Sequence, residues 1–161
     1  MPKVRRSLHV PFSPAQIFDL VVDIENYPRF VPGWRSVRIL SKARNIDGDP
    51  DRGQLVVDQK VSEKGLRFRF QTEARYRKPS YIRIATTSAP YRYFMLIWHF
   101  ASDGQGGCRV QVYTRYRLRA VPLQYLAERH FNRLLDDVIR SFEREARRRY
   151  GSRQTGRRVG R

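Results

Sequence analysis

The sequence is poor in the residues that build disulfides and metal sites. It contains a single cysteine, Cys108, which excludes an internal disulfide bond and any cysteine-based metal cage. A lone cysteine fits a reducing, cytoplasmic setting. The three histidines, His9, His99 and His130, are far apart and lack the spacing of metal ligands. No Ser/His/Asp or paired-carboxylate arrangement can be identified, so the sequence predicts no catalytic residue and no metal.

Long hydrophobic runs are also missing. No apolar segment approaches the roughly 20 residues that a membrane-spanning helix needs. The first ten residues, MPKVRRSLHV, are basic but precede no apolar segment, so they do not predict a secretory signal. Val4, Leu8 and Val10 instead fall on a period of two and predict a strand. We expect one domain over residues 1–150.

Acidic residues are few. The chain has 15 Asp and Glu against 33 Lys and Arg, and the net charge is +18. This charge favours an anionic partner, such as nucleic acid, the ribosome or an anionic membrane surface. However, 28 of the 33 basic residues are arginine, and such a bias can also come from genome composition. The tail GSRQTGRRVGR, residues 151–161, is basic, lacks apolar periodicity and is expected to be disordered.

The first helix is marked by a strong start signal. Ser13 is a good N-cap, Pro14 suits the first helical position, and Gln16 completes a capping box. Phe12 and Ile17 are spaced as a hydrophobic staple across this cap. The pattern predicts a helix from residue 14 to about residue 22.

Two prolines shape the segment that follows. Asp23 is placed to cap a second short turn, which Pro28 is expected to end, and Pro32 prevents a longer helix. The stretch YPRFVPGW, residues 27–34, is therefore expected to form an ordered connection held by its own aromatic rings.

Residues 35–119 alternate with a period of two. In GLRFRFQTEARYR, residues 65–77, apolar residues occupy one face and arginines the other, and CRVQVYTRYRLRA, residues 108–120, repeats this pattern. Turn signals separate the segments: NIDGDPDRG, SEKG, RKPS, SAP and SDGQGG. Clean alternation with short links predicts an antiparallel meander with one covered face.

The last predicted element is a long amphipathic helix over residues 122–149. Its apolar residues recur every three or four positions: Leu123, Ala127, Phe131, Leu134, Leu135, Val138, Phe142 and Ala146. One helix cannot bury this stripe alone, and the apolar face of the sheet is the available partner. The predicted fold class is α+β, a helix-grip in which a curved antiparallel sheet wraps around the long C-terminal helix, with two short helices after the first strand.

Three segments resemble one known family. VPFSPAQIFDLVVDIENYPRFVP (10–32), APYRYFMLIWHF (89–100) and FNRLLDDVIRSFEREARRRYG (131–151) resemble the coenzyme Q-binding proteins of the START/polyketide-cyclase superfamily. The first segment is typical of the superfamily, and the other two narrow the resemblance toward the quinone-binding branch. The resemblance covers nearly the whole ordered length of the chain and implies the helix-grip (START-like) fold.

The resemblance implies a non-catalytic carrier. Members bind a polyprenyl quinone between sheet and helix and support quinone use in respiration, so ubiquinone is the expected ligand and no cofactor is required. A bacterial branch is described as an antitoxin-partnered protein that associates with the ribosome, which is the alternative function. A lesser alternative is an enzyme of the polyketide cyclase or aromatase type.

The expected ligand lies among side chains that point between the sheet and the last helix, because aromatic walls suit flat apolar ligands. Gln59 is the polar residue expected on this face, and a buried amide needs a partner, which a quinone carbonyl, a water molecule or a neighbouring group can supply. The same residues would also serve as an ordinary core. The predicted ligand-binding residues are Phe18, Tyr27, Phe30, Trp34, Gln59, Phe68, Phe70, Phe94, Trp98, Phe131, Leu134, Leu135 and Val138.

A docking surface is expected on the other face of the sheet. The strand over residues 91–100 carries an apolar stripe there, and a meander brings the neighbouring arginine rows beside it. An exposed apolar stripe flanked by arginines predicts docking to an anionic membrane, which would hold the protein at the inner face of the cytoplasmic membrane, or to the large ribosomal subunit. The predicted residues are Arg67, Arg69, Tyr93, Met95, Ile97, Arg115 and Arg117.

Overall fold

A single antiparallel sheet organises the computed structural model, which describes residues 3–63 and 65–151. The later strands follow one another as a meander: β2 (Trp34–Arg44), β3 (Arg52–Glu63), β4 (Leu66–Arg77), β5 (Tyr81–Thr86), β6 (Tyr91–Ser102) and β7 (Cys108–Leu118). The first strand, β1 (Lys3–Val10), pairs with β7, so the order is β1-β7-β6-β5-β4-β3-β2. The tail predicted over residues 151–161 lies, apart from Gly151, outside the described residues.

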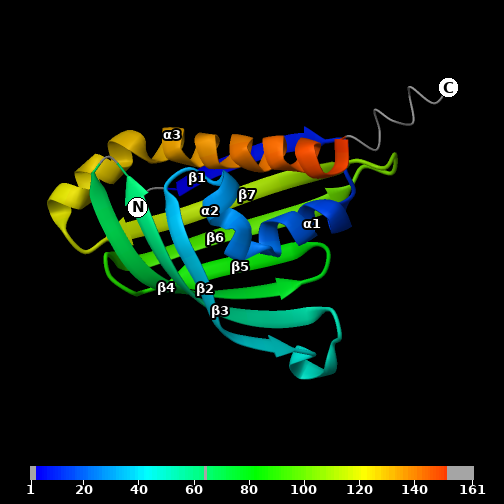
Figure 1. Cartoon of the computed structure of the whole chain (residues 1–161), viewed down its shortest axis with the longest axis horizontal. Coiled ribbons are helices and arrows are strands. Elements are labelled where there is room, and N and C mark those ends of the chain that lie inside the picture. The colour runs from blue at the N-terminus through cyan, green and yellow to red at the C-terminus, as the bar shows by residue number, and fades with distance from the viewer. Residues whose placement is uncertain (1–2, 64, 152–161) are drawn as a thin grey trace.

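The helices cover one face of this sheet, which we call the inner face (Figure 1). The long helix α3 (Val121–Ala146) crosses the inner face, and the short helices α1 (Pro14–Val22) and α2 (Tyr27–Phe30) pack beside it. The curved sheet grips α3, which confirms the predicted helix-grip fold with two short helices after the first strand. A 3-10 turn, η1 (Ile24–Asn26), joins the short helices, and another, η2 (Ile46–Gly48), lies between β2 and β3.

The predicted capping box begins α1. The Ser13 hydroxyl accepts a hydrogen bond from the Gln16 backbone N–H at 3.2 Å, and the Gln16 side chain accepts one from the Ser13 N–H at 2.9 Å. Phe12 and Ile17 are both buried, as a hydrophobic staple requires. These contacts fix the direction in which the chain leaves β1.

The prediction for the next turn was wrong in two details. Pro28 does not end a helix but lies in the first turn of α2, where its missing N–H has no helical partner to lose. Asp23 does not cap a backbone N–H with its side chain; its carboxylate accepts a hydrogen bond from the Asn26 side-chain amide at 2.7 Å. The connection is therefore more helical than the two prolines suggested.

Burial alternates along the strands as predicted. In β4, Phe70, Thr72 and Ala74 are buried on the inner face while Gln71 and Arg75 are exposed. In β7, every second residue from Cys108 to Tyr116 is buried. The alternation places the arginine rows on the outer face, opposite the helices.

Helix α3 begins and ends close to the predicted positions, and a π-helical turn, η3 (Arg147–Gly151), follows it. Its buried residues all lie in its second half: Leu135, Ile139, Ser141, Phe142, Glu145 and Ala146. The helix therefore packs against the rest of the protein far more closely at one end than at the other.

Candidate ligand-binding site and outer face

Aromatic side chains from α2, β2, β6 and α3 meet edge to face at one end of the interface between sheet and helix. The Tyr27 ring lies 6.2 Å from Trp34 and 5.2 Å from Phe142, and Phe142 lies 5.4 Å from Trp98. Phe30 contacts both Tyr27 and Phe142. Residues 27–34 thus close this end of the interior with their own rings.

Gln59 is buried, and the structure supplies its partners. The Trp34 indole N–H donates to the Gln59 side-chain oxygen at 2.8 Å, and the Gln59 amide donates to the Thr72 hydroxyl at 2.6 Å. This chain of hydrogen bonds crosses β2, β3 and β4 on the inner face. The amide therefore has internal partners and does not depend on a ligand for them.

Unlike Gln59, the buried Trp98 side chain lacks a hydrogen-bond partner for its indole N–H among the described residues. The same side chain lines a cavity of about 20 Å³, together with apolar residues of β1, α1 and α3 that include Leu20, Ile139 and Phe142. This volume suits about one water molecule, so Trp98 is an unpaired donor beside a small cavity.

The first half of α3 leaves apolar surface uncovered. Residues 121–134 include no buried residue. Phe131 stacks on Tyr116 of β7, with ring centroids 4.2 Å apart, yet stays half-buried. On the inner face of the sheet, Phe68 and Phe94 are also only half-buried. This half of the interior is therefore open compared with the closed end around Phe142.

Three tyrosine hydroxyls in the interior are held in the neutral form. Burial raises the pKa of Tyr27, whose hydroxyl donates to the Val21 carbonyl oxygen. Burial, and then the neighbouring Tyr116, raise the pKa of Tyr91 to about 12. Burial, and then the Glu128 carboxylate, raise the pKa of Tyr116 to about 12. Each hydroxyl keeps its proton at neutral pH and remains a hydrogen-bond donor.

The predicted ligand-binding residues fall into two sets by exposure. The buried set is Phe18, Tyr27, Gln59, Phe70, Trp98 and Leu135. The half-buried set is Phe30, Trp34, Phe68, Phe94, Phe131, Leu134 and Val138. Phe18 contacts Tyr76 and Phe100, away from the open half. Phe68, Phe94, Phe131 and Leu134 belong to the open half.

Sequence reasoning missed Tyr91 as an inner residue. Alternation counted back from Phe94 places Tyr91 on the outer face with Tyr93. A β-bulge between Tyr91 and Tyr93 changes the register, so Tyr91 pairs with Leu118 and its ring lies 5.2 Å from Phe70. A bulge adds one residue to the count and turns the side chain over, and no pattern in the sequence marks it.

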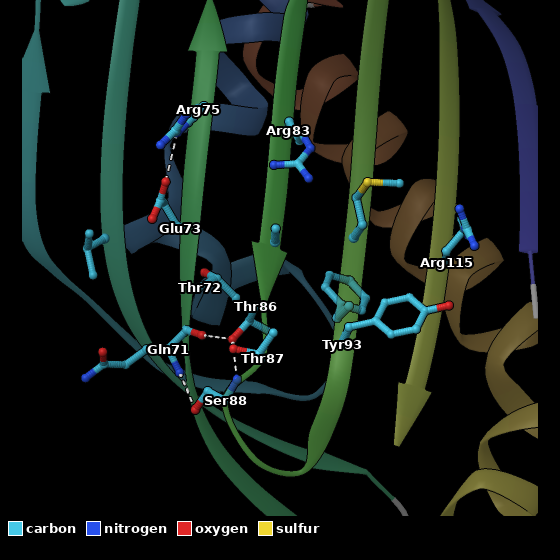
Figure 2. Close-up of a pocket in the computed structure, with 14 residues that line it drawn as sticks. Gln71, Thr72, Glu73, Arg75, Arg83, Thr86, Thr87, Ser88, Tyr93 and Arg115 are labelled. Carbon is cyan, nitrogen blue, oxygen red and sulfur yellow. Dashed lines mark hydrogen bonds and ion pairs between the residues drawn. The ribbon is translucent and has the colours of Figure 1, made fainter. Parts of the chain in front are cut away.

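The outer face of the sheet carries a hollow of about 920 Å³ over β3 to β7, which we call the outer hollow. Figure 2 shows Arg75, Arg83 and Arg115 in front of the sheet, with the helices behind. Arginines from three strands line it, together with one carboxylate, polar side chains near the end of β5 and apolar ones. They are Val56, Gln71, Thr72, Glu73, Arg75, Arg83, Ala85, Thr86, Thr87, Ser88, Tyr93, Phe94, Met95 and Arg115.

The predicted docking surface needs correction. Tyr93, Met95 and Ile97 do lie on the outer face, where they pair with Arg117, Arg115 and Tyr113. However, all three are half-buried rather than exposed, and Tyr93 and Met95 line the outer hollow. Arg67 and Arg69 are exposed on β4, before the segment Glu73–Arg77 that pairs with β5.

Groups with catalytic or metal-binding chemistry are scattered. The His9 ring pairs with Asp103 at 2.6 Å on the surface, and His99 contacts the Tyr81 ring on the outer face. The described residues contain no group of three or more His, Cys, Asp or Glu side chains arranged to hold a metal. None of the described helices is long and apolar enough to cross a membrane.

Comparisons with known proteins agree with this fold. The chain is 26% identical over 153 residues to the ribosome association toxin RatA of Escherichia coli K12, covering 95% of this chain and 92% of that protein. It is 25% identical over 150 residues to the mitochondrial coenzyme Q-binding protein COQ10 homolog B of Xenopus laevis, covering 87% of this chain and 56% of that protein. The crystal structure of the Zhui aromatase/cyclase from Streptomyces superposes with a TM-score of 0.78 at 14% identity, over 92% of this chain and 94% of that one.

These relatives have different names although they share one fold. At 14% identity, the similarity to the aromatase/cyclase shows only that the fold is shared. The family model described as "Polyketide cyclase / dehydrase and lipid transport" matches residues 10–143, which include every helix and strand from α1 to β7 and most of α3. The chain belongs to this family of the START/polyketide-cyclase superfamily.

Proposed function

We propose that the protein binds a hydrophobic prenylated ligand, ubiquinone or a close relative, between the sheet and the first half of α3. The observation that carries this proposal is the open half of the interior. Residues 121–134 of α3 include no buried side chain. Phe131 of its apolar stripe stacks on Tyr116 of β7, and Phe68 and Phe94 on the inner face of the sheet are also only half-buried. Covering such apolar surface is favourable in water, and a long apolar ligand would cover it from both sides.

Donor groups in the interior support a ligand with carbonyl oxygens. At the closed end, beside Phe142, the Trp98 indole N–H is buried without a partner among the described residues, and a buried donor left unpaired costs about 1–3 kcal/mol. The Tyr91 and Tyr116 hydroxyls keep their protons. A quinone offers two carbonyl acceptors on a flat apolar ring, which suits these donors and the aromatic walls.

Binding such a ligand requires the interior to open. The cavity beside Trp98 has a volume of about 20 Å³, whereas pockets for ligands of this size measure about 300–1,000 Å³. That cavity is lined by the second half of α3, so the ligand would instead enter where the first half of α3, which few contacts hold, moves away from the sheet. Those contacts include the stack of Phe131 on Tyr116 and a 2.7 Å hydrogen bond from the Leu118 N–H to the Gln124 side chain.

The interior favours a carrier over a cyclase. The polar groups between sheet and helix include an indole at Trp98, an amide at Gln59, and hydroxyls at Thr72, Tyr91 and Tyr116. Such groups orient a ligand by hydrogen bonding but exchange protons poorly near neutral pH. The relative named COQ10 homolog B, a coenzyme Q-binding protein, supports ubiquinone as the ligand.

The start of α3 supports docking at an anionic membrane. Val121 and Tyr125 are 67% and 68% exposed, and Leu126 is 39% exposed. Arg92, Arg117 and Arg119 line a hollow of about 520 Å³ that also includes Val121 and Tyr125. Apolar side chains next to arginines suit the boundary between lipid tails and anionic headgroups. This surface adjoins the open half, so a ligand could pass directly from the bilayer.

Tryptophan fluorescence tests the ligand proposal, because the chain has two tryptophans, Trp34 and Trp98, both in the interior. Titration with a short-chain ubiquinone should quench their emission to saturation near one equivalent. In the Trp34→Phe variant, Trp98 alone should still be quenched to saturation. The same quinone should leave emission unchanged in a Phe131→Trp, Leu134→Trp double variant whose bulk fills the open half. Quenching that never saturates, or that persists fully in the filled variant, would overturn the proposal.

A second candidate is association with the ribosome. A relative that matches 95% of this chain is named a ribosome association toxin, and the net charge of +18 suits ribosomal RNA. This candidate predicts co-sedimentation with the large subunit, with affinity that falls steeply as salt rises because phosphate contacts release counterions. Protein that stays in the supernatant at low salt would remove the candidate.

A further inference from the structure

The outer hollow is the largest of the cavities described above, and the ligand proposal does not use it. It lies on the face of the sheet opposite α3, so a ligand between sheet and helix does not reach it (Figure 2). Its volume of about 920 Å³ is far larger than a single small ion needs. Whatever binds there must match its charge, depth and polar groups.

The charge of the outer hollow is positive. Arg75, Arg83 and Arg115 line it against one carboxylate, Glu73, which is bound to Arg75 at 2.8 Å. Arg75 and Arg83 are directly paired across β4 and β5, and Arg83 forms no ion pair with a carboxylate among the described residues. Like charges directly opposite each other destabilise a sheet, and Glu73 is bound to only one of these two arginines. Arg83 therefore favours an anionic occupant.

Apolar and charged side chains differ in exposure in the outer hollow. Tyr93 and Met95 line the hollow and are half-buried, while Arg83 is exposed. A single nucleic-acid strand is narrow enough to lie along the hollow, and it would bring phosphates and bases together.

The outer hollow also contains polar and aromatic groups that suit single-stranded RNA. The hydroxyls of Thr86, Thr87 and Ser88 gather at one end, where Thr86 donates to the Gln71 carbonyl oxygen and the Ser88 N–H donates to the Thr86 hydroxyl at 2.9 Å. Figure 2 shows the Tyr93 ring extending across the sheet face toward Arg115. Sheet surfaces that bind single-stranded RNA combine an aromatic ring for stacking, arginines for phosphates and polar groups for base edges and 2′-hydroxyls.

We propose that the outer hollow binds a single-stranded segment of RNA, with phosphates on Arg83 and Arg115 and a base stacked on Tyr93. This inference deepens the ribosome-association candidate and rests on it for the choice of RNA. It is independent of the ligand proposal. Glu73 also lines the outer hollow, but its carboxylate is bound to Arg75. The negative charge that it presents to the RNA is therefore largely compensated.

Fluorescence anisotropy with a short labelled single-stranded oligoribonucleotide tests the proposal. Arg83→Glu should weaken binding by about tenfold or more and flatten the salt dependence, since each phosphate contact contributes about 0.7 to the logarithmic slope. Tyr93→Ala should weaken binding by about tenfold, and Tyr93→Phe should retain it because stacking persists. The matched control is Arg133→Glu, which makes the same charge change at an exposed position of α3 on the opposite side of the molecule.

The outcomes separate this proposal from its alternatives. Equal losses for Arg83→Glu and Arg133→Glu would show attraction by net charge alone and overturn it. Loss of binding to anionic phosphatidylglycerol vesicles in Arg83→Glu and Tyr93→Ala, with RNA binding unchanged, would assign the hollow to a membrane and overturn it. Normal co-sedimentation of Arg83→Glu with the large subunit would show that the ribosome is bound elsewhere, leaving the association candidate intact while overturning this site. Thermal unfolding of each variant checks that its fold is unchanged.

Discussion

The two halves of α3 share one apolar stripe but have different surroundings. In the second half, Leu135, Ile139 and Phe142 are buried against the sheet and the short helices. In the first half, the stripe continues through Phe131 and Leu134, yet residues 121–134 include no buried side chain. The same periodicity therefore gives a buried second half of α3, which we call the anchor, and a largely uncovered first half.

Polar contacts reinforce the anchor. The buried Glu145 carboxylate accepts hydrogen bonds from Arg148 and Arg149 at 2.7–2.8 Å, and Arg149 also reaches the Asp23 carboxylate at 3.1 Å. This network ties the end of α3 to the connection after α1. At the boundary between the halves, Arg6 of β1 binds Asp136 at 2.7 Å. The helix is therefore tied to the rest of the protein at its end and at its middle, whereas its start is largely uncovered.

The largest expected loss of stability follows from removing a buried aromatic ring in the second half of α3. Phe142→Ala removes a ring that contacts Tyr27, Phe30 and Trp98, so it should lower the free energy of unfolding by about 3–5 kcal/mol. Denaturant titration followed by circular dichroism measures this change. The control is Leu126→Ala in the open half, where the loss should stay within about 0.5 kcal/mol because the side chain is 39% exposed. If both variants lost similar amounts of unfolding free energy, the two halves of α3 would not differ in how tightly they pack.

A smaller effect is expected at the polar network. Hydrogen bonds from Arg148, and then Arg149, lower the pKa of Glu145 to about 2, against an ordinary value of 4.5. A carboxyl whose pKa is lower in the folded protein stabilises it above the unfolded pKa, and this stabilisation is lost as pH falls from about 4.5 to about 2. Glu145→Gln should cost about 1–3 kcal/mol at pH 7, because charged hydrogen bonds are lost.

The pH profile distinguishes this explanation from a simple packing defect. Unfolding free energies of the wild-type protein and of Glu145→Gln should converge as pH falls through that window. Profiles of Glu145→Gln and wild type that stay parallel would mean that Glu145 is not the titrating group.

In the open half, stability and ligand affinity should respond differently. Phe131→Ala removes a half-buried ring stacked on Tyr116, so it should cost only about 1 kcal/mol of stability but weaken quinone binding by about tenfold. Tryptophan quenching measures the affinity. Phe18→Leu, deep in the core beside Phe100, provides the reverse case: a loss of stability with affinity retained. If Phe131→Ala bound quinone as well as the wild type, the open half would not be the site.

The smallest effect on stability is expected at the start of α3. Tyr125→Glu changes a side chain that is 68% exposed, so the free energy of unfolding should change by no more than about 0.5 kcal/mol. Co-sedimentation with anionic vesicles should nevertheless fall severalfold, because a charge replaces an apolar group at the lipid boundary. Gln105→Glu, at an exposed turn between β6 and β7, adds the same charge and should bind vesicles normally. Equal losses would point to net charge instead of a docking surface.

The sequence predicts the fold because its signals are local. The capping box at Ser13 and Gln16, the alternation along residues 65–77 and the three-to-four spacing in α3 each require only a short window of sequence, and the structure agrees with all of them. The inner and outer faces follow from the same alternation, so the outer position of Met95 was predictable.

Features that depend on how elements meet were not predictable. The apolar stripe of α3 does not show where the helix lifts from the sheet, because that depends on sheet curvature. The bulge that turns Tyr91 inward adds one residue to a strand without any mark in the sequence. The outer hollow that Met95 lines depends on how the side chains of β3 to β7 come together. The partners of Gln59 and the absence of a described partner for Trp98 likewise emerge only when distant strands are placed side by side.

The most direct test of the central claim is mass spectrometry of lipids extracted from the protein after gentle purification from a quinone-containing bacterium. A similarly basic protein, purified in parallel, controls for lipids carried by charge. If the open half of α3 holds a prenylated quinone, the extract should contain ubiquinone in near-stoichiometric amount, and Phe131→Ala should carry much less. An extract with no more quinone than the control protein carries would contradict the account.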